Sequence, residues 1–510
     1  MMAMHPALRN PEVIYTISSY TEHGSIPALA STCRAFERPA LNVLWRDLQS
    51  VEPLIRCLIS EDLFDTVQYD HDDFKEHMVL QKPLDDKMWD TLCKYTSRVH
   101  SITQSGNSMF IESLCLLMLS CPSASAASKL FPNLVKLTWN ADGTKDAAEF
   151  LRMAFVPSLV IFNMHISSAS SAFLAVLSSL GTSCPSLQVL NSRIPRTTDS
   201  SHKTSPFITQ SISQLHHLQS LTVCDLGIQG IQQVMQLRAL HFLSLDFRKS
   251  SAWDMKTHLD PPGFRDLHHL DLSFDTPEHA SNFLSSLPVV RSKKIKIGFT
   301  PRAARSSTSE FNTVSQFFAT IQEKCDNDKL ESFTLYGFSG KLHASPDVFT
   351  PLHACRNLTR LLIDRGCDIS IAWPKLEVLS ISRYVDIDDI AVPTFHGLIS
   401  LLRLCPALTS LALVIDTTKQ KRIDLTHPGN GSRHENLETL VLGNSPIKSP
   451  RNVALILSGL FPRLEGVNLE CWDTISMDSL PRKKSEMRQW ESVNTFLGGF
   501  SIVKERCKGA

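Results

Sequence analysis

Apolar residues recur along this chain in one unit, L-x-x-L-x-[LVI], which a proline, cysteine or histidine often introduces. The last two apolar positions of the unit alternate with polar ones, as in a β-strand that buries one face. Copies begin at Phe131, Val156, Cys184, Leu215, Leu237, Phe264, Lys329, Cys355, Trp373, Cys405, His434 and Phe461. The pattern predicts a series of similar strands along most of the chain.

The spacing of the copies gives the size of the repeated unit. Leu134 and Leu464, the first leucines of the first and last copies, lie 330 residues apart. They enclose either 11 or 12 intervals, because the degenerate string from Ser292 can be counted as a copy or left out. The mean spacing is roughly 28 to 30 residues, at the long end of the range for leucine-rich repeats.

Segments between the copies have the apolar spacing of amphipathic helices. They span 146–155, 171–180, 278–287, 310–325 and 452–460. One strand and one helix cannot bury their apolar faces alone, and stacking the units places a parallel sheet on the concave side and helices on the convex side. We therefore expect an α/β fold, a leucine-rich-repeat solenoid of about 12 to 14 repeats over residues 95–485. A C-terminal helical cap is expected over 486–510.

Cysteine recurs at one point of the repeat, directly before the strand, at Cys184, Cys355 and Cys405. A helix normally ends before a proline, and a small apolar cysteine can fill the gap at such a turn. We interpret these residues as packing residues, with redox or metal-binding roles as the alternatives.

Residues 1–58 have helical spacing and lack the strand pattern. Asn10 and Pro11 are typical of a helix start, and Gly24 is expected to end that helix. A second helix is expected from about Ser25, and a third from Pro39. Their apolar residues are Val13, Ile14 and Ile17, then Leu29, Ala30, Cys33 and Phe36, then Leu41, Leu44, Trp45 and Leu48. Three helices in about 50 residues bury little surface, so we expect spare apolar surface to dock on a partner or on the solenoid.

The same segment resembles an F-box. The residues that carry the resemblance are Leu8, Pro11, Glu12, Ile14, Leu29, Ala30, Cys33, Arg34, Phe36, Ala40, Leu41, Leu44 and Trp45. The stretch from Gln81 to Thr103 is similar to the segment that joins the F-box to the first repeat in F-box proteins of mushroom-forming (basidiomycete) fungi. The likeness extends over the whole chain and departs from the family pattern where Arg9 and Asn10 separate Leu8 from Pro11.

The resemblance implies a substrate-recognition subunit of a Skp/cullin/F-box ubiquitin ligase. The N-terminal helices would bind a Skp-type adaptor, and through it a cullin, while the repeats would bind a protein substrate. The expected adaptor-binding residues are Leu8, Pro11, Ile14, Leu29, Cys33, Phe36, Leu44 and Trp45. Among them Ile14, Leu29 and Trp45 are the expected anchors, because large apolar side chains carry most of the energy of an interface.

Three other interpretations remain open at this point. The N-terminal helices can be a cap for the solenoid. The chain can be a protein-binding scaffold or an inhibitor of the ribonuclease-inhibitor type, without any adaptor. It can also be an enzyme with an unconventional site. An apolar stripe packed against the first repeat would favour the scaffold, and an exposed stripe would favour the ligase subunit.

The amino-acid composition limits the kinds of partner and the compartment that we expect for this chain. Lys plus Arg and Asp plus Glu each number 51, so the formal net charge is zero and no overall field draws in nucleic acid or an anionic membrane. The N-terminus lacks the pattern of a secretory signal, and thirteen cysteines with no C-x-x-C pair are typical of reduced thiols. We expect a cytoplasmic or nuclear protein that is a monomer within its complex.

Conventional catalytic motifs are absent from the sequence, including nucleotide-binding glycine loops, H-E-x-x-H and G-x-S-x-G. The acidic segment 59–94 is expected to be a linker with a solvated loop. The paired histidines at His216 and at His268 make a zinc site conceivable, but repetition of the unit explains the match more simply. We expect no catalytic residue, no cofactor and no metal.

Substrate contacts are expected at the polar positions between the strand leucines, which point away from the core. The candidates are Lys136, Phe242, Asp246, Arg360 and Asp364. Charged side chains with one aromatic ring fit a protein surface better than a phosphate or a lipid.

Overall fold

The computed structural model describes residues 10–58, 64–68, 76–106, 109–119, 130–193, 201–248, 264, 266–300, 309–337, 346–363, 373–381, 392–429, 433–469 and 481–508. The chain divides into two compact units, Met1–Leu240 and His241–Ala510. Both units contain parallel strands and helices, so the chain has an α/β fold. Within these described ranges, no helix has both the length and the apolar character needed to cross a membrane.

Unit 1 begins with a small group of helices. They are α1 (Pro11–Tyr20), the 3-10 helix η2 (His23–Ser25), α2 (Ile26–Thr32) and α3 (Arg34–Leu44). Asn10 caps α1, because its side chain accepts a hydrogen bond of 2.9 Å from the amide of Glu12. Both α1 and α2 pack against α3, and Ile14, Ile26 and Ala40 form the buried centre.

The second and third helices divide at a different point from the sequence prediction. Cys33 has extended backbone angles, φ −163° and ψ 163°, and it separates α2 from α3. Cys33 therefore precedes the third helix, and Phe36 lies within it. Pro39 lies inside this helix and does not start one. The reason is that the fixed φ of proline is already helical, whereas an extended residue cannot continue a helix.

The sheet of unit 1 is parallel, with its strands in chain order. Its strands are β1 (Asp47–Leu48), β4 (Ser101–Ser105), β5 (Lys136–Asn140), β6 (Ile161–His165), β7 (Val189–Arg193) and β8 (Ser220–Cys224). Its helices are α4 (Glu52–Arg56), α5 (Asp86–Thr96), α6 (Met109–Leu119), α8 (Lys145–Ala154), α9 (Ser171–Ser178), α10 (Leu180–Ser183), α11 (Ser201–Ile212) and α12 (Gly227–Val234). A separate antiparallel pair, β2 (Phe64–Gln68) and β3 (Glu76–Leu80), lies in the segment expected as a linker.

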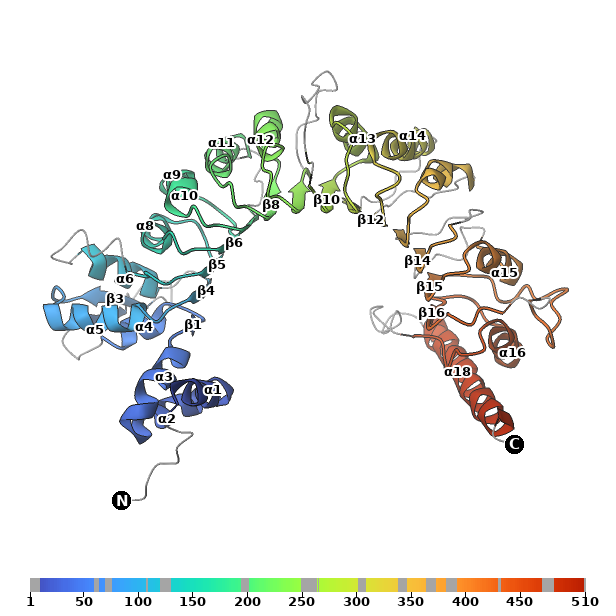
Figure 1. Ribbon diagram of the computed structural model, residues 1–510, viewed down its shortest axis with the longest axis horizontal. Coiled ribbons are helices and arrows are strands. Elements are labelled where there is room, and N and C mark those ends of the chain that lie inside the picture. The colour runs from blue at the N-terminus through green and yellow to red at the C-terminus, as the bar shows by residue number, and fades with distance from the viewer. Residues whose placement is uncertain are drawn as a thin grey trace. The chain divides into compact units, whose positions relative to one another are not determined.

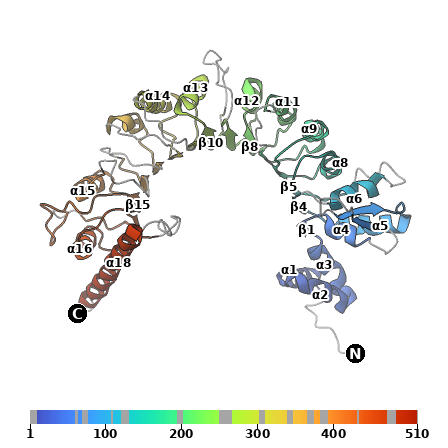
Figure 2. The same cartoon turned by 180° about the vertical axis from the view of Figure 1, so that it is seen from behind.

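Unit 2 repeats the same arrangement. Its parallel strands are β9 (Phe242–Asp246), β10 (His269–Phe274), β11 (Lys294–Phe299), β12 (Ser332–Tyr336), β13 (Arg360–Ile363), β14 (Val378–Ile381), β15 (Ser410–Leu413) and β16 (Thr439–Val441). Its helices are α13 (Pro277–Ser286), α14 (Ser309–Lys324), the 3-10 helix η3 (Pro346–Ala354), α15 (Phe395–Leu404), α16 (Pro450–Leu460) and α18 (Pro481–Lys508). In each unit the strands line one side and the helices cover the other (Figure 1), as the reverse view also shows (Figure 2).

The strand register stacks the repeat leucines into continuous buried rows. In unit 1 the paired residues are Ile102, Leu137, Phe162, Leu190 and Leu221. In unit 2 they are Leu243, Leu270, Ile295, Phe333, Leu361, Leu379, Leu411 and Leu440. All of them are buried, and each such side chain stabilises the fold by roughly 1.5 to 3 kcal/mol. The alternation found in the sequence thus corresponds to one buried and one open face of the sheet.

The helices begin where a side chain can satisfy their first free amides. Asp85 accepts from Met88 at 2.7 Å before α5, Thr144 accepts from Ala147 at 3.2 Å before α8, and Ser170 accepts from Phe173 at 3.2 Å before α9. The helical segments 146–155, 171–180, 278–287, 310–325 and 452–460 correspond to α8, α9 with α10, α13, α14 and α16. The predicted helices are therefore confirmed for these segments.

Strand pairing in the structure shows which copies of the repeated sequence unit form strands. The degenerate string from Ser292 contains β11, which pairs with β10 and β12 and is therefore a copy of the unit. The last string, from Phe461, forms no strand within the described residues 461–469, although the amide of Asn468 donates to the carbonyl of Leu440 at 2.8 Å. At the other end β1 and β4 precede the first string, so the parallel sheet starts earlier than the repeat pattern indicates.

Candidate protein-binding surfaces

Helix α1 has one buried face and one apolar stripe that is open to solvent. The buried face contains Ile14 and Ser18 and packs against α3. The apolar stripe is Val13, Ile17 and Tyr20, spaced at i, i+4 and i+7 on one side of the helix. Ile17 is 38% exposed and Tyr20 is 88% exposed. Large apolar side chains that share one helix face and remain open to solvent are typical of an interaction surface.

The expected adaptor-binding residues have different environments. Ile14 is 3% exposed and belongs to the core of the module, so it is not a free anchor. Leu8 lies outside the described residues. Pro11 and Cys33 are exposed, whereas Leu29, Phe36, Leu44 and Trp45 are partly buried. The exposed positions Ile17 and Tyr20 were not among the expected residues. Their spacing from Val13 is the signal that could have found them.

The C-terminal end of α3 packs against α5 of unit 1. Trp45 stacks on Tyr95 of α5, with ring centroids 4.5 Å apart and an interplanar angle of 29°. Arg46 donates to the hydroxyl of Tyr15 at 2.8 Å, and its carbonyl accepts the amides of His100 and Ser101 at the start of β4. The helical module is therefore joined to the sheet of unit 1 through packing, hydrogen bonds and the pairing of β1 with β4.

Arg98 strengthens this junction. Its guanidinium donates to the side chain of Asn42 and, at 3.3 Å, to the carbonyl of Arg38. Burial, followed by the nearby charge of Arg38, lowers the pKa of Arg98. A guanidinium keeps its proton at neutral pH even so, because its ordinary pKa is above 12. The junction thus contains a fixed positive group that holds α3 in place.

One row on the open face of the unit 1 sheet is polar and uncharged. It runs through the paired residues Thr103, Thr138, Asn163, Asn191 and Thr222. The amide of Asn163 lies 3.5 Å from the hydroxyl of Thr138. Lys136, a candidate substrate contact, is exposed at the end of this face. Hydroxyl and amide groups can form hydrogen bonds to a bound chain without selecting its charge.

The open face of the unit 2 sheet carries charged and aromatic residues. Lys296 of β11 donates to Asp271 of β10 at 3.1 Å, and its ammonium lies 4.7 Å from the ring centroid of Tyr336 of β12. The hydroxyls of Tyr336 and Ser273 are 3.3 Å apart. The ring of Tyr336 reaches across β11 because Gly298 has no side chain there: a Cβ on this glycine would lie 2.2 Å from the ring.

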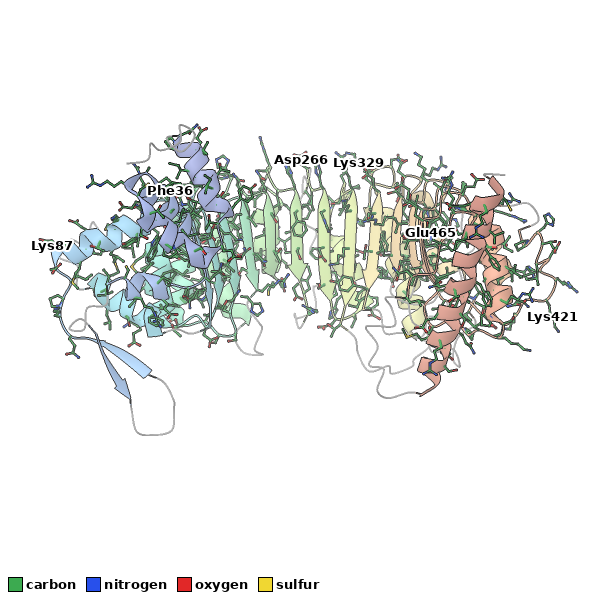
Figure 3. The ribbon with its side chains drawn as sticks, turned by 90° about the horizontal axis from the view of Figure 1, so that it is seen from below. Phe36, Lys87, Asp266, Lys329, Lys421 and Glu465 are labelled. Carbon is green, nitrogen blue, oxygen red and sulfur yellow. The ribbon has the colours of Figure 1, made fainter. Side chains whose placement is uncertain are left out.

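A second row lies beside this network on the same face. Phe242 and His269 pair in register, and their rings meet edge to face at 4.7 Å. His269 is followed across the sheet by Lys294, Ser332 and Arg360. Burial lowers the pKa of His269, and the neighbouring lysines lower it further, against the opposing charge of Asp271. Figure 3 views the strand-lined side, with Asp266 and Lys329 along the edge where β10 and β12 begin.

Two of the candidate substrate residues of unit 2 already contact other side chains of the chain. Asp246 forms an ion pair with Arg248 at 2.6 Å, Phe242 packs on His269, and Arg360 is exposed. Asp364 lies outside the described residues. Lys294 and Lys296 were not predicted to act together with Asp271 or Tyr336. Their alternation with the strand leucines was the available signal.

The repeated cysteines are packing residues. Cys184, Cys355 and Cys405 are fully buried, and Cys325, which precedes β12 and forms an isolated bridge with Val290, is buried as well. Burial raises the pKa of Cys184 to about 12 and that of Cys355 to about 11. Such thiols are protonated at neutral pH and unreactive. Within the described residues, no group of three or more His, Cys, Asp or Glu could hold a metal ion.

A hollow of about 580 Å³ lies at the end of the repeats, where β16 has no further strand beside it within the described part of the chain. It is bordered by β16, by residues 466–469 and by Met487 of α18. The buried face of α18 closes this end, since Trp490 donates to the carbonyl of Ser445 at 3.1 Å. The helix therefore covers the last repeat, starting at Pro481 where the sequence predicted a cap from residue 486.

No protein-family model matches the chain, and no curated protein is significantly similar to it in sequence. The resemblance to F-box proteins therefore stays a prediction from the residues of the N-terminal segment.

Proposed function

We propose that the chain is the substrate-recognition subunit of a Skp/cullin/F-box ubiquitin ligase. The N-terminal helices would bind a Skp-type adaptor, and through it a cullin, and the open face of the sheet would bind a protein substrate. In this role the chain has no active site of its own and acts in the cytoplasm or the nucleus.

The supporting observation is the exposed stripe on α1. Ile17 and Tyr20 lie in a helical module whose core is already formed by Ile14, Ile26 and Ala40. Tyr20, which is 88% exposed, adds little to the packing of the module, and Ile17 remains 38% exposed. Apolar residues on a helix face that are free in the isolated chain are suited to fill pockets on a partner.

Co-purification with a Skp-type adaptor tests this function. Ile17→Asp and Tyr20→Asp should each reduce adaptor binding at least ~10-fold, because a charge would be placed in a desolvated interface. Ile502→Asp is the matched control, since Ile502 is similarly exposed on α18. Deletion of residues 1–58 is a poorer test, because it also removes β1 and the buried Leu54 of the sheet unit.

Two results would contradict the proposal. The first is that the folded, full-length chain fails to bind the adaptor. The second is that the two α1 variants bind it as well as the Ile502 variant does. Circular dichroism of each variant separates loss of binding from loss of folding.

A protein-binding scaffold or inhibitor without a ligase is the second candidate. The stacking of Trp45 on Tyr95 favours it, because this end of α3 covers α5 of unit 1 as a cap would. A cap alone does not require the exposed side chains of Ile17 and Tyr20. The adaptor-binding experiment therefore distinguishes the two functions.

A further inference from the structure

Two cations on the open face of unit 2 have no acidic partner among the described residues. Lys294 of β11 and Arg360 of β13 are both exposed, and Ser332 of β12 lies between them in register. Within the described part of this face, the acids on the strands are paired: Asp271 with Lys296 at 3.1 Å and Asp246 with Arg248 at 2.6 Å. The described part of this face therefore has an excess of positive charge around Ser332.

Neighbouring groups reinforce this excess. Lys293, directly before β11, pairs with Glu331 at 3.0 Å, so Glu331 is already engaged by another lysine. The positive charges of Lys294 and Lys296 also contribute to the lowered pKa of His269 in the adjacent strand. A carboxylate supplied from outside would meet two cations and a hydroxyl without displacing an existing ion pair.

An apolar contact lies on the same row. Phe242 and His269 present adjacent rings, with Phe242 partly exposed. Strands are spaced about 4.8 Å apart, so the row from β9 to β13 is about 19 Å long, which is the length of about six residues of extended chain. Lys294 and Arg360, two strands apart, are separated by about 10 Å along this row.

We infer that this row, which we call the β9–β13 row, binds an extended acidic segment of a partner protein that carries an aromatic residue followed by carboxylates. The aromatic side chain would pack at Phe242, and the carboxylates would pair with Lys294 and Arg360 on either side of Ser332. This inference rests on the proposed role of the open face in binding a protein substrate and names the chemistry of that substrate.

Fluorescence polarisation with the full-length chain tests the inference without any adaptor. The probe is a labelled peptide that carries one tryptophan followed by glutamates at alternate positions, and its counterpart has glutamine in place of glutamate. The glutamate peptide should bind more tightly, with an affinity that falls as salt is added. Lys294→Glu and Arg360→Glu should each weaken its binding about tenfold, as expected for a lost attraction replaced by repulsion.

Two controls test whether the effect depends on these two residues and on their charge. Lys421→Glu makes the same charge change at an exposed residue away from the strands (Figure 3) and should leave binding unchanged. A peptide with lysine in place of glutamate should bind the Lys294→Glu, Arg360→Glu double variant better than the glutamate peptide does. That exchange of preference cannot arise from unfolding.

Three outcomes would overturn the inference. They are equal binding of the glutamate and glutamine peptides, an equal loss in the Lys421 variant, and tighter binding of a single-stranded oligothymidine than of the acidic peptide. Adaptor binding is measured separately through α1. Failure of the peptide experiment therefore leaves the ligase role standing, and failure of adaptor binding leaves the peptide site standing on a scaffold.

Discussion

Trp45 stacks on Tyr95 at the point where the N-terminal helices meet α5, with 4.5 Å between the ring centroids. Trp45 directly follows α3 and Tyr95 lies in α5, fifty positions later in the sequence. The contact makes the helical module part of the folded unit and leaves the stripe of Ile17 and Tyr20 open on α1. The module can therefore be a cap at one end and a docking surface at the other.

Removal of the Trp45 ring should destabilise unit 1. Trp45→Ala is expected to lower the free energy of unfolding by about 2 kcal/mol, less than for a fully buried tryptophan because Trp45 is partly exposed. Urea unfolding followed by circular dichroism measures the change. In a double-mutant cycle with Tyr95→Ala, the coupling energy should be about 1 kcal/mol, as for other aromatic pairs. Strictly additive effects would show that the rings stack without stabilising the junction.

Gly298 should be intolerant of even one added carbon. In Gly298→Ala the new Cβ would collide with the ring of Tyr336, which must then leave Ser273 and Lys296. We expect a loss of about 1 to 3 kcal/mol in unfolding free energy. The loss should be much smaller when the same change is made in a Tyr336→Ala background, and equal losses in both backgrounds would contradict the proposed clash.

The two lysine pairs of unit 2 should differ in their effect on stability. Lys296→Met leaves the carboxylate of Asp271, only 16% exposed, without its cation and should cost about 2 kcal/mol. Lys293→Met breaks a pair whose side chains are 52% and 43% exposed, and it should cost less than about 1 kcal/mol. Chemical denaturation of both variants gives the comparison. An equal cost would mean that burial of Asp271 does not strengthen its pair.

Alkaline pH should destabilise the fold through its buried thiols. Burial raises the pKa of Cys325 to about 12. In the unfolded chain a thiol ionises near pH 8.5. As the pH rises, the unfolded chain therefore loses this proton before the folded chain does. The contribution of this thiol to the free energy of unfolding is complete below about pH 8.5. It is lost as the pH rises toward 12, by up to ~1.4 kcal/mol per pH unit for one such thiol.

Unfolding measurements between neutral and alkaline pH check this dependence. Cys325→Ala should make the fall in stability with pH shallower, whatever its effect at pH 7. Cys33→Ala, at an exposed cysteine, should leave the slope as it is in the parent chain. The explanation would be wrong if the two variants had the same slope.

Part of the fold follows from the sequence through local spacing. The alternation around Leu137, Leu270 and Leu411 predicts strands with one buried face, and the structure confirms this register at each of them. The same holds for helices such as α8 and α14, because a period of 3.6 can be read within a short window. Burial of the repeated cysteines was also predictable, since each precedes a strand at the same point of the unit.

Other features depend on residues that are far apart in the chain. The break at Cys33, the collision that makes Gly298 necessary and the contact of Trp45 with Tyr95 are all set by neighbours in three dimensions. The sequence by itself determined the repeated strand and helix pattern, because each unit encodes its own period. Only the tertiary structure decided which charges are paired and which remain open, because the side chains of adjacent repeats meet only after stacking sets the register between them.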